Sequence, residues 1–207
     1  MTHWLTHGPV SGREISEMDE RMQRLLELLE KDELRELVIL YAHRIVTQDW
    51  RGIAELFTED GILDYSDIAT LARPAAATTA QRAAGSDLVF VGRQAIADFL
   101  PAVGRLEVKA FFTNHLVRVT GDDAVGICFF DNRVTQGGAS VIGAGRMFDE
   151  YRRVAGRWRL AYRRQELFYF TGLHEGWAEG PDRHRQPTPI ARRGWEAELI
   201  AGWGARS

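Results

Sequence analysis

The chain has 207 residues, of which 45% are hydrophobic and 27% charged, and its formal net charge is −3. This is the composition of an ordinary soluble globular protein, and the length fits one domain with an appendage. Basic pairs such as Arg152-Arg153 have acidic neighbours, so the charge gives no reason to expect a nucleic acid or an anionic membrane as partner. The single cysteine, Cys128, excludes an internal disulfide and a thiolate-rich zinc site.

The first ten residues lack a basic region followed by a long apolar run, and no stretch is long and apolar enough to span a bilayer. We therefore expect a cytoplasmic protein. The one H-x-x-x-H spacing, His3 and His7, has no helical pattern around it and no nearby third ligand. No glycine-rich phosphate loop follows a predicted strand either, so we expect neither a metal nor another cofactor.

Helices are predicted in the N-terminal part of the chain. The first covers residues 16–31 and has an apolar stripe made of Met18, Met22, Leu25 and Leu29. The second runs from about residue 32 to 48, and its periodicity places Tyr41 on the core side. A short helix at 50–57 and a short strand at 62–65 follow.

The middle of the chain begins with residues 66–86, which are rich in Ala and Thr and are interpreted as a surface excursion or lid. Residues 86–92 are predicted to be extended, and residues 93–100 a helix stopped by Pro101. A long antiparallel sheet is predicted from about residue 106 to 170, with hairpin turns at 121–122, 136–138 and 155–156.

Helices followed by a long antiparallel sheet indicate an α+β fold. We divide the chain into a leader and helix (1–31), the main domain (32–170) and a C-terminal extension (171–207). The extension carries Gly, Pro and three tryptophans, a composition typical of a tail that wraps its own domain or a neighbouring subunit.

Titratable residues occur at positions of the predicted sheet that are expected to face the interior. His115 shares its side-chain direction with Val117, and Asp131 shares its direction with Ile127, because side chains two apart in a strand face the same way. A buried imidazole and carboxylate are costly unless paired or used. The opposite register, with Phe130 facing inward and Asp131 facing solvent, is also apolar and stays open.

The segments Tyr41–Trp50, Leu56–Gly61 and Gly145–Trp158, in this order and spacing, resemble SnoaL-like proteins of the nuclear transport factor 2-like superfamily. The resemblance covers roughly residues 32–170. It implies a cone in which a curved mixed sheet wraps around the N-terminal helices and encloses a deep apolar pocket. Members include scytalone dehydratase, bile acid 7α-dehydratase and hexachlorocyclohexane dehydrochlorinase, which abstract protons without metal or coenzyme.

By similarity, His115 falls at the family's catalytic histidine, Tyr41 and Asp131 at catalytic positions of the bile acid enzyme, and Tyr65 at a pocket tyrosine. The dehydratases carry an aspartate that orients the histidine at the position of Val46. Valine cannot accept a hydrogen bond through its side chain. Asp131 is therefore the expected partner that orients His115.

Four further residues are predicted to bind substrate. Phe112, Phe129 and Phe168 belong to an aromatic supply that suggests an aromatic or polycyclic ligand. Arg164 continues the inward direction of Trp158 and therefore needs an anionic partner, unless a bulge shifts the register before it.

The residues together favour a cofactor-free lyase, either a dehydratase or isomerase or a deformylating enzyme, with His115 as general base and tyrosines as donors. The alternative is a non-catalytic ligand-binding module or a structural subunit like the small subunit of ring-hydroxylating dioxygenases, which Val46 favours. We also expect a homodimer or homotrimer formed through the convex face of the sheet.

Overall fold

The computed structural model describes residues 12–67, 88–103, 107–175, 194–195 and 198–199. The helices are α1 (Gly12–Thr47), α2 (Trp50–Glu55) and α5 (Arg93–Val103), with a 3₁₀ turn at Leu173–Glu175. The strands are β1 (Phe57–Asp64), β2 (Val89–Val91), β3 (Glu107–Thr120), β4 (Asp123–Gln136), β5 (Ala139–Val154) and β6 (Arg157–Gly172). The predicted excursion at 66–86 and most of the C-terminal extension lie outside the described residues. No helix within the described ranges could cross a membrane.

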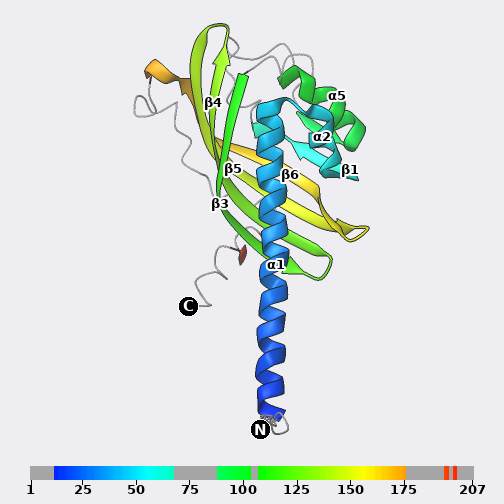
Figure 1. Ribbon diagram of the computed structural model, residues 1–207. Helices are drawn as coiled ribbons and strands as arrows, with labels where there is room; N and C mark the ends of the chain where they lie inside the picture. Colours follow the sequence, from blue (N-terminus) through cyan, green and yellow to red (C-terminus); the bar gives the residue numbers. More distant parts are fainter. Residues whose placement is uncertain (1–11, 68–87, 104–106, 176–193, 196–197, 200–207) are drawn as a thin grey trace, which may run out of the picture.

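Within the described residues, six strands form one mixed sheet in the order β2-β1-β6-β5-β4-β3. Only β1 and β6 are parallel, and the other neighbours are antiparallel. The sheet curls around the helices without closing (Figure 1). The expected α+β fold, with a curved mixed sheet around N-terminal helices, is confirmed. We call the face that packs on the helices the inner face and the opposite one the outer face.

Tight hairpins connect the consecutive strands β3, β4, β5 and β6, as the sequence predicted. Each turn has two residues between paired strand ends. At Gly137 and Gly138 φ is 56° and 81°, and at Ala155 and Gly156 it is 49° and 76°. Two successive positive φ angles are what a two-residue turn needs to match the twist of the strands, which explains the glycines.

α1 is one helix of 36 residues, where the sequence analysis predicted two. The expected boundary at residues 31–32 contains no Gly or Pro, so nothing ends the helix there. Its first part, residues 12–31, extends beyond the sheet (Figure 1), and we call it the stalk. Glu30 anchors the stalk's base, since it accepts a hydrogen bond of 2.7 Å from Trp158 Nε1 and pairs with Arg153. α5 likewise continues through Pro101, which lies in its last turn.

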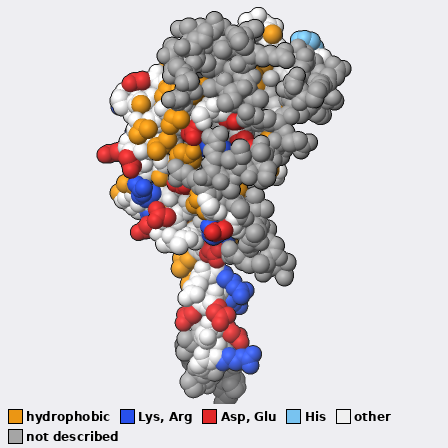
Figure 2. Space-filling model, turned by 180° about the vertical axis from the view of Figure 1, so that it is seen from behind, with side chains coloured by type: hydrophobic (Ala, Val, Ile, Leu, Met, Phe, Trp, Pro, Cys, Tyr) orange, Lys and Arg blue, Asp and Glu red, His pale blue; other side chains and the backbone are white. Residues whose placement is uncertain are grey.

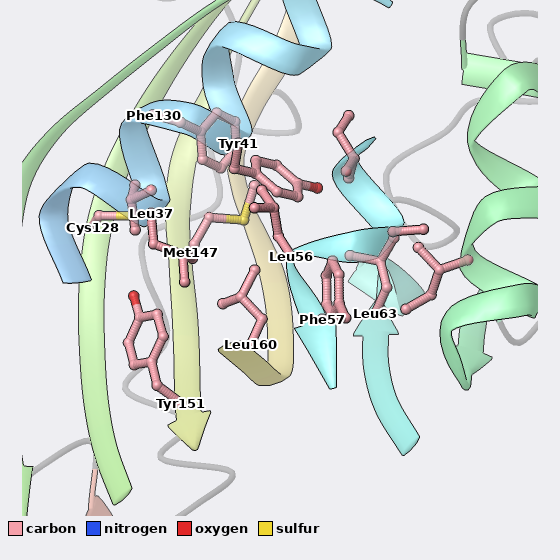
Figure 3. Close-up of a cluster of buried hydrophobic side chains, with 14 of the residues drawn as sticks. Leu37, Tyr41, Leu56, Phe57, Leu63, Cys128, Phe130, Met147, Tyr151 and Leu160 are labelled. Atoms are coloured by element: carbon pink, nitrogen blue, oxygen red, sulfur yellow. The ribbon is translucent and has the colours of Figure 1, made fainter. Parts of the chain in front are cut away.

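The core on the inner face combines α1, α2 and the sheet. Figure 3 shows part of it, with Tyr41 from α1 and Tyr151 from β5 in the same apolar cluster. A second, smaller cluster on the outer face contains Ile127, Phe148 and Leu199. Beside it, Trp195 donates a hydrogen bond of 3.0 Å to Glu150. These described residues of the C-terminal extension therefore pack on the chain's own sheet.

A bulge in β6 decides which arginine faces the interior. Glu150 pairs with Tyr162 but Tyr151 with Leu160, so Ala161 has no opposite residue. The extra residue reverses the side-chain direction beyond it. Arg163 therefore lies on the inner face, and the predicted inward position of Arg164 is wrong.

Arg163 forms a fully buried ion pair with Asp149 of β5. Its Nε and Nη2 donate to the two carboxylate oxygens at 2.8 and 2.7 Å, and both side chains are 0% exposed. Two parallel hydrogen bonds match the planar guanidinium to the carboxylate. The pair links β5 to β6 inside the core, where either charge alone would be strongly unfavourable.

We expect Asp149→Ala to lower the free energy of unfolding by about 3–5 kcal/mol, because it leaves the Arg163 cation buried without its counter-ion. Denaturant unfolding of the purified variant measures this directly. The matched control is Asp131→Ala, which breaks an ion pair whose side chains are 44% and 54% exposed and should cost at most about 1 kcal/mol. Equal costs for the two variants would contradict the structural importance of the buried pair.

Candidate functional site

His115 lies on the inner face with Val117, as the alternation of β3 predicts, and an irregularity in the strand brings Phe112 to the same face. The register shifts between Thr113 and Leu116, and Asn114 has a φ of 54°. As a result Phe112 and His115, three residues apart, both face inward. On the neighbouring strand Gly126 leaves room for the ring, because a Cβ there would lie 2.9 Å from His115 Nε2.

A chain of hydrogen bonds runs from His115 to the buried ion pair. The Tyr151 hydroxyl donates to Asp149 Oδ2 at 2.8 Å and lies 3.0 Å from His115 Nε2. A phenol has one proton. Since Tyr151 uses that proton to donate a hydrogen bond to Asp149, its oxygen accepts a hydrogen bond from Nε2–H of His115. The neutral imidazole is therefore the Nε2–H tautomer, with its lone pair on Nδ1.

Nδ1 of His115 is buried and has no hydrogen-bond partner among the described residues. Burial lowers the pKa of His115 from 6.5 to about 4, although the Asp149 carboxylate opposes this shift. Burial also raises the pKa of Tyr151 well above its usual value, so Tyr151 remains a phenol that can hold the tautomer. The arrangement leaves an uncharged acceptor nitrogen facing the apolar interior.

Two tyrosine hydroxyls form the other end of the site. Tyr41 Oη and Tyr65 Oη lie 3.0 Å apart in the core. One of their two protons serves this hydrogen bond, so the other remains available to donate. Burial raises the pKa of both groups, which keeps them protonated. The Arg163 guanidinium carbon lies 4.1 Å from the centre of the Tyr41 ring, which connects this pair to Asp149.

Arg163 also has an unused donor, since its buried Nη1 has no hydrogen-bond partner among the described residues. Its charge is already balanced by Asp149. An oxygen acceptor on a bound molecule would satisfy this donor without a second negative charge. We call His115, Tyr151, Asp149, Arg163, Tyr41 and Tyr65 the inner-face network.

Four of the predicted site residues belong to this region. His115, Tyr41 and Tyr65 are members of the network, and Phe112 packs edge-on against Tyr41 with ring centres 6.0 Å apart. The other four lie on the outer face. The rings of Phe129 and Phe168 contact each other there, with their centres 5.9 Å apart. The guanidinium carbon of Arg164 lies 4.1 Å from the centre of the Phe148 ring.

The expected pairing of Asp131 with His115 is wrong. Asp131 forms an ion pair with Arg133, and its side chain is 44% exposed. Both side-chain directions of β4 are apolar, and the alternative register left open by the sequence is the observed one, with Cys128 and Phe130 in the inner cluster. Val46 is 38% exposed, so no side chain at that position of α1 orients His115.

Three network residues were missed by sequence reasoning. Asp149 and Tyr151 could have been found, because they share the direction of Met147 in a strand that the sequence predicted. Arg163 could not, because the bulge at Ala161 reverses the alternation that the sequence suggests.

One recess of the structure is separate from the inner-face network, and the described residues include no metal-ligand group. A recess of about 160 Å³ lies among the ends of β3, β4 and β5, lined by residues such as Lys109 and Ile142, and no network residue belongs to its lining. Within the described ranges, no three His, Cys, Asp or Glu side chains group as metal ligands do.

Comparison with known proteins identifies what this fold is similar to. A family model described as a SnoaL-like domain matches residues 26–164. A candidate scytalone dehydratase from Novosphingobium aromaticivorans superposes with a TM-score of 0.58 and 17% identity, covering 78% of this chain and 96% of that one. LinA superposes with a TM-score of 0.59 and 18% sequence identity, covering 76% of this chain and 99% of that one. A protein of unknown function from Mycobacterium tuberculosis superposes with a TM-score of 0.56 and 23% identity, covering 86% of this chain and 94% of that one. No curated protein sequence matches.

We expect His115 to titrate near pH 4, as measured by the NMR shifts of its imidazole protons, because burial opposes the charged ring. In the unfolded chain the ring takes up its proton near pH 6.5. The unfolded state therefore binds more protons between pH 6.5 and about 4, and the free energy of unfolding falls as the pH decreases through this window.

His115→Gln should remove part of this pH dependence, whereas His43→Gln, at an exposed position of α1, should leave it unchanged. A midpoint of His115 near 6.5 would show that the ring is solvated and would contradict the site described.

Proposed function

We propose that this chain, which belongs to the SnoaL-like family as its sequence predicted, is a cofactor-free lyase of the dehydratase type. The observation that carries the proposal is the unpaired, buried Nδ1 of His115. A neutral imidazole nitrogen without a protein partner is suited to accept a proton from a bound molecule.

The general base would be His115 Nδ1. When it takes a proton, the ring becomes an imidazolium whose Nε2–H still donates to Tyr151, and Tyr151 in turn donates to Asp149. The negative carboxylate at the end of this chain favours the charged ring. Asp149 and Tyr151 thus act as positioning residues that orient the base and stabilise its protonated form.

The general acid would be the hydroxyl pair of Tyr41 and Tyr65. Raised pKa values keep both phenols protonated until a stronger base, such as a departing hydroxide, forms beside them. Arg163 Nη1 would donate to a substrate carbonyl or enolate oxygen, because it is the remaining unpaired cationic donor of the network.

The proposed step is the loss of water from a β-hydroxy carbonyl compound. Nδ1 of His115 removes a proton from a carbon next to a carbonyl, and the C–H electrons form a carbon–carbon double bond. The bond from the adjacent carbon to its hydroxyl oxygen breaks, and a tyrosine proton converts the leaving group to water. The proton on His115 then returns to the tyrosinate through water, so no oxidant or reductant is needed.

The substrate would be an aromatic or polycyclic small molecule. Aromatic side chains surround the tyrosine pair on the inner face, with Phe112 against Tyr41 and Phe99 against Tyr65 at ring distances of 6.0 Å. Aromatic surroundings of this kind favour a flat apolar ligand with few polar groups. A solved structure described as a candidate aromatic ring hydroxylase, also from Novosphingobium aromaticivorans, is 25% identical with a TM-score of 0.56.

The alternative is a non-catalytic ligand-binding or structural protein. The observation that favours it is Val46, which stands where the sequence resemblance places the histidine-orienting aspartate of the dehydratases. In that case the network would bind an oxygen-containing ligand through Arg163 and the tyrosines without proton transfer.

Purified protein can be tested with aryl β-hydroxy ketones that carry phenyl, naphthyl or steroid-like groups. Loss of water gives conjugated aryl enones, whose near-ultraviolet absorbance reports turnover. We expect His115→Ala to reduce kcat/KM by at least about 100-fold, the usual share of general acid–base catalysis.

His43→Ala is the matched control, because His43 is exposed on α1 and should retain wild-type turnover. Undiminished turnover by His115→Ala would rule out this histidine as the base. Quenching of tryptophan fluorescence measures ligand binding. Binding without turnover in the wild type would support the non-catalytic alternative instead.

A further inference from the structure

The stalk exposes an apolar surface that the proposed function does not use. Six large apolar side chains between residues 18 and 29 are at least half exposed, from 50% for Leu25 to 61% for Met18. These are Met18, Met22, Leu25, Leu26, Leu28 and Leu29. The face of the stalk seen in Figure 2 carries mainly charged side chains, so the helix is amphipathic although it extends beyond the sheet.

Four of these residues are spaced as in a coiled coil. Met18, Met22, Leu25 and Leu29 follow one another by four, three and four residues, the spacing of successive a and d positions in a heptad. Such a seam packs against a second helix that has a matching seam. Leu26 and Leu28 widen it on both sides.

The seam does not continue the side of α1 that packs on the sheet. Leu34 follows Leu25 by nine residues, as Val38 follows Leu29, and nine residues are two and a half helical turns. The buried residues Leu34 and Val38 therefore point away from the direction of the seam. The chain's own described sheet cannot cover the seam.

We propose that the stalk seam is a self-association surface that pairs antiparallel with the stalk of a second copy of this chain. In this arrangement Met18 of one copy lies opposite Leu29 of the other, and Met22 opposite Leu25. Because the globular part of each chain follows residue 31, the two sheets lie at opposite ends of the paired stalks and do not collide.

Charge decides between antiparallel and parallel pairing. The next two seam positions after Leu29 are Asp32 and Glu36, and both are exposed. A parallel pair would bring four carboxylates together along the seam. An antiparallel pair separates them and places Asp32 and Glu33 near the helix N-terminus and Arg13 of the other copy, where negative charge is stabilised.

The size of the apolar surface fits this partner. The six side chains expose roughly 600 Å² per chain, which is at the upper end for the largest apolar patch of a monomer. A stable interface buries about 800 Å² per partner, and the neighbouring polar side chains of a paired stalk would supply the remainder.

The oligomeric state of the full chain tests the proposal by light scattering after gel filtration. We expect the wild type to have twice the mass of one chain and Leu25→Glu/Leu29→Glu to be monomeric. Both positions are exposed, so the fold should persist, which circular dichroism checks. Gln23→Glu, exposed on the other side of the stalk, adds the same type of charge and should remain dimeric.

Cross-linking tests the orientation. We expect an equal mixture of Met18→Cys and Leu29→Cys chains to form a mixed disulfide dimer on oxidation. Neither variant alone should cross-link, because like positions in the antiparallel pair are eleven residues apart, or roughly 16 Å along the helix, beyond the reach of a disulfide. Cys128 is buried, so it should not compete for the disulfide.

Three outcomes would overturn the proposal. A monomeric wild type would show that the seam does not associate. A double glutamate variant that stays oligomeric would place the interface elsewhere, for example on the outer face of the sheet. Disulfides between like positions would show a parallel pair.

Discussion

The site depends on the buried ion pair between Arg163 and Asp149. It joins β5 to β6 in the core, lies beneath the ring of Tyr41 and supplies the acceptor for Tyr151. A buried ion pair contributes little net stability compared with a well-packed apolar pair. Its effect is geometric. Removing either partner leaves an uncompensated charge. Removing Asp149 also takes away the carboxylate to which Tyr151 donates when it orients His115.

The network shows how this fold can orient a histidine without a carboxylate on the first helix. The sequence resemblance implies such a carboxylate at the position of Val46, which is partly exposed. Here the carboxylate comes from the sheet, as Asp149, and acts through the phenol of Tyr151. Because the Tyr151 hydroxyl oxygen accepts the hydrogen bond from Nε2–H, the lone pair is on Nδ1, and the low pKa of His115 keeps that nitrogen unprotonated at neutral pH.

The order of the elements and the hairpin turns could be predicted from the sequence, because local signals determine them. The glycines at 137 and 138 require a turn, and inward His115 follows from its strand. Other features depend on the packing of the whole sheet. One extra residue at Ala161 exchanged the roles of Arg163 and Arg164, and Asp131 was misplaced because both directions of its strand are apolar. The stalk's apolar stripe was visible in the sequence, but only the structure shows that it continues past the sheet as part of one unbroken helix.

The tautomer of His115, measured at neutral pH by two-bond ¹H–¹⁵N correlation NMR of the imidazole ring, is the most direct test of the proposed base. We expect the Nε2–H form, with Nδ1 showing the shift of an unprotonated nitrogen. Tyr151→Phe should weaken this preference, because it removes the oxygen that accepts the Nε2–H bond. An Nδ1–H tautomer, or a ring that is charged at neutral pH, would contradict the account, since neither form leaves Nδ1 free to accept a proton.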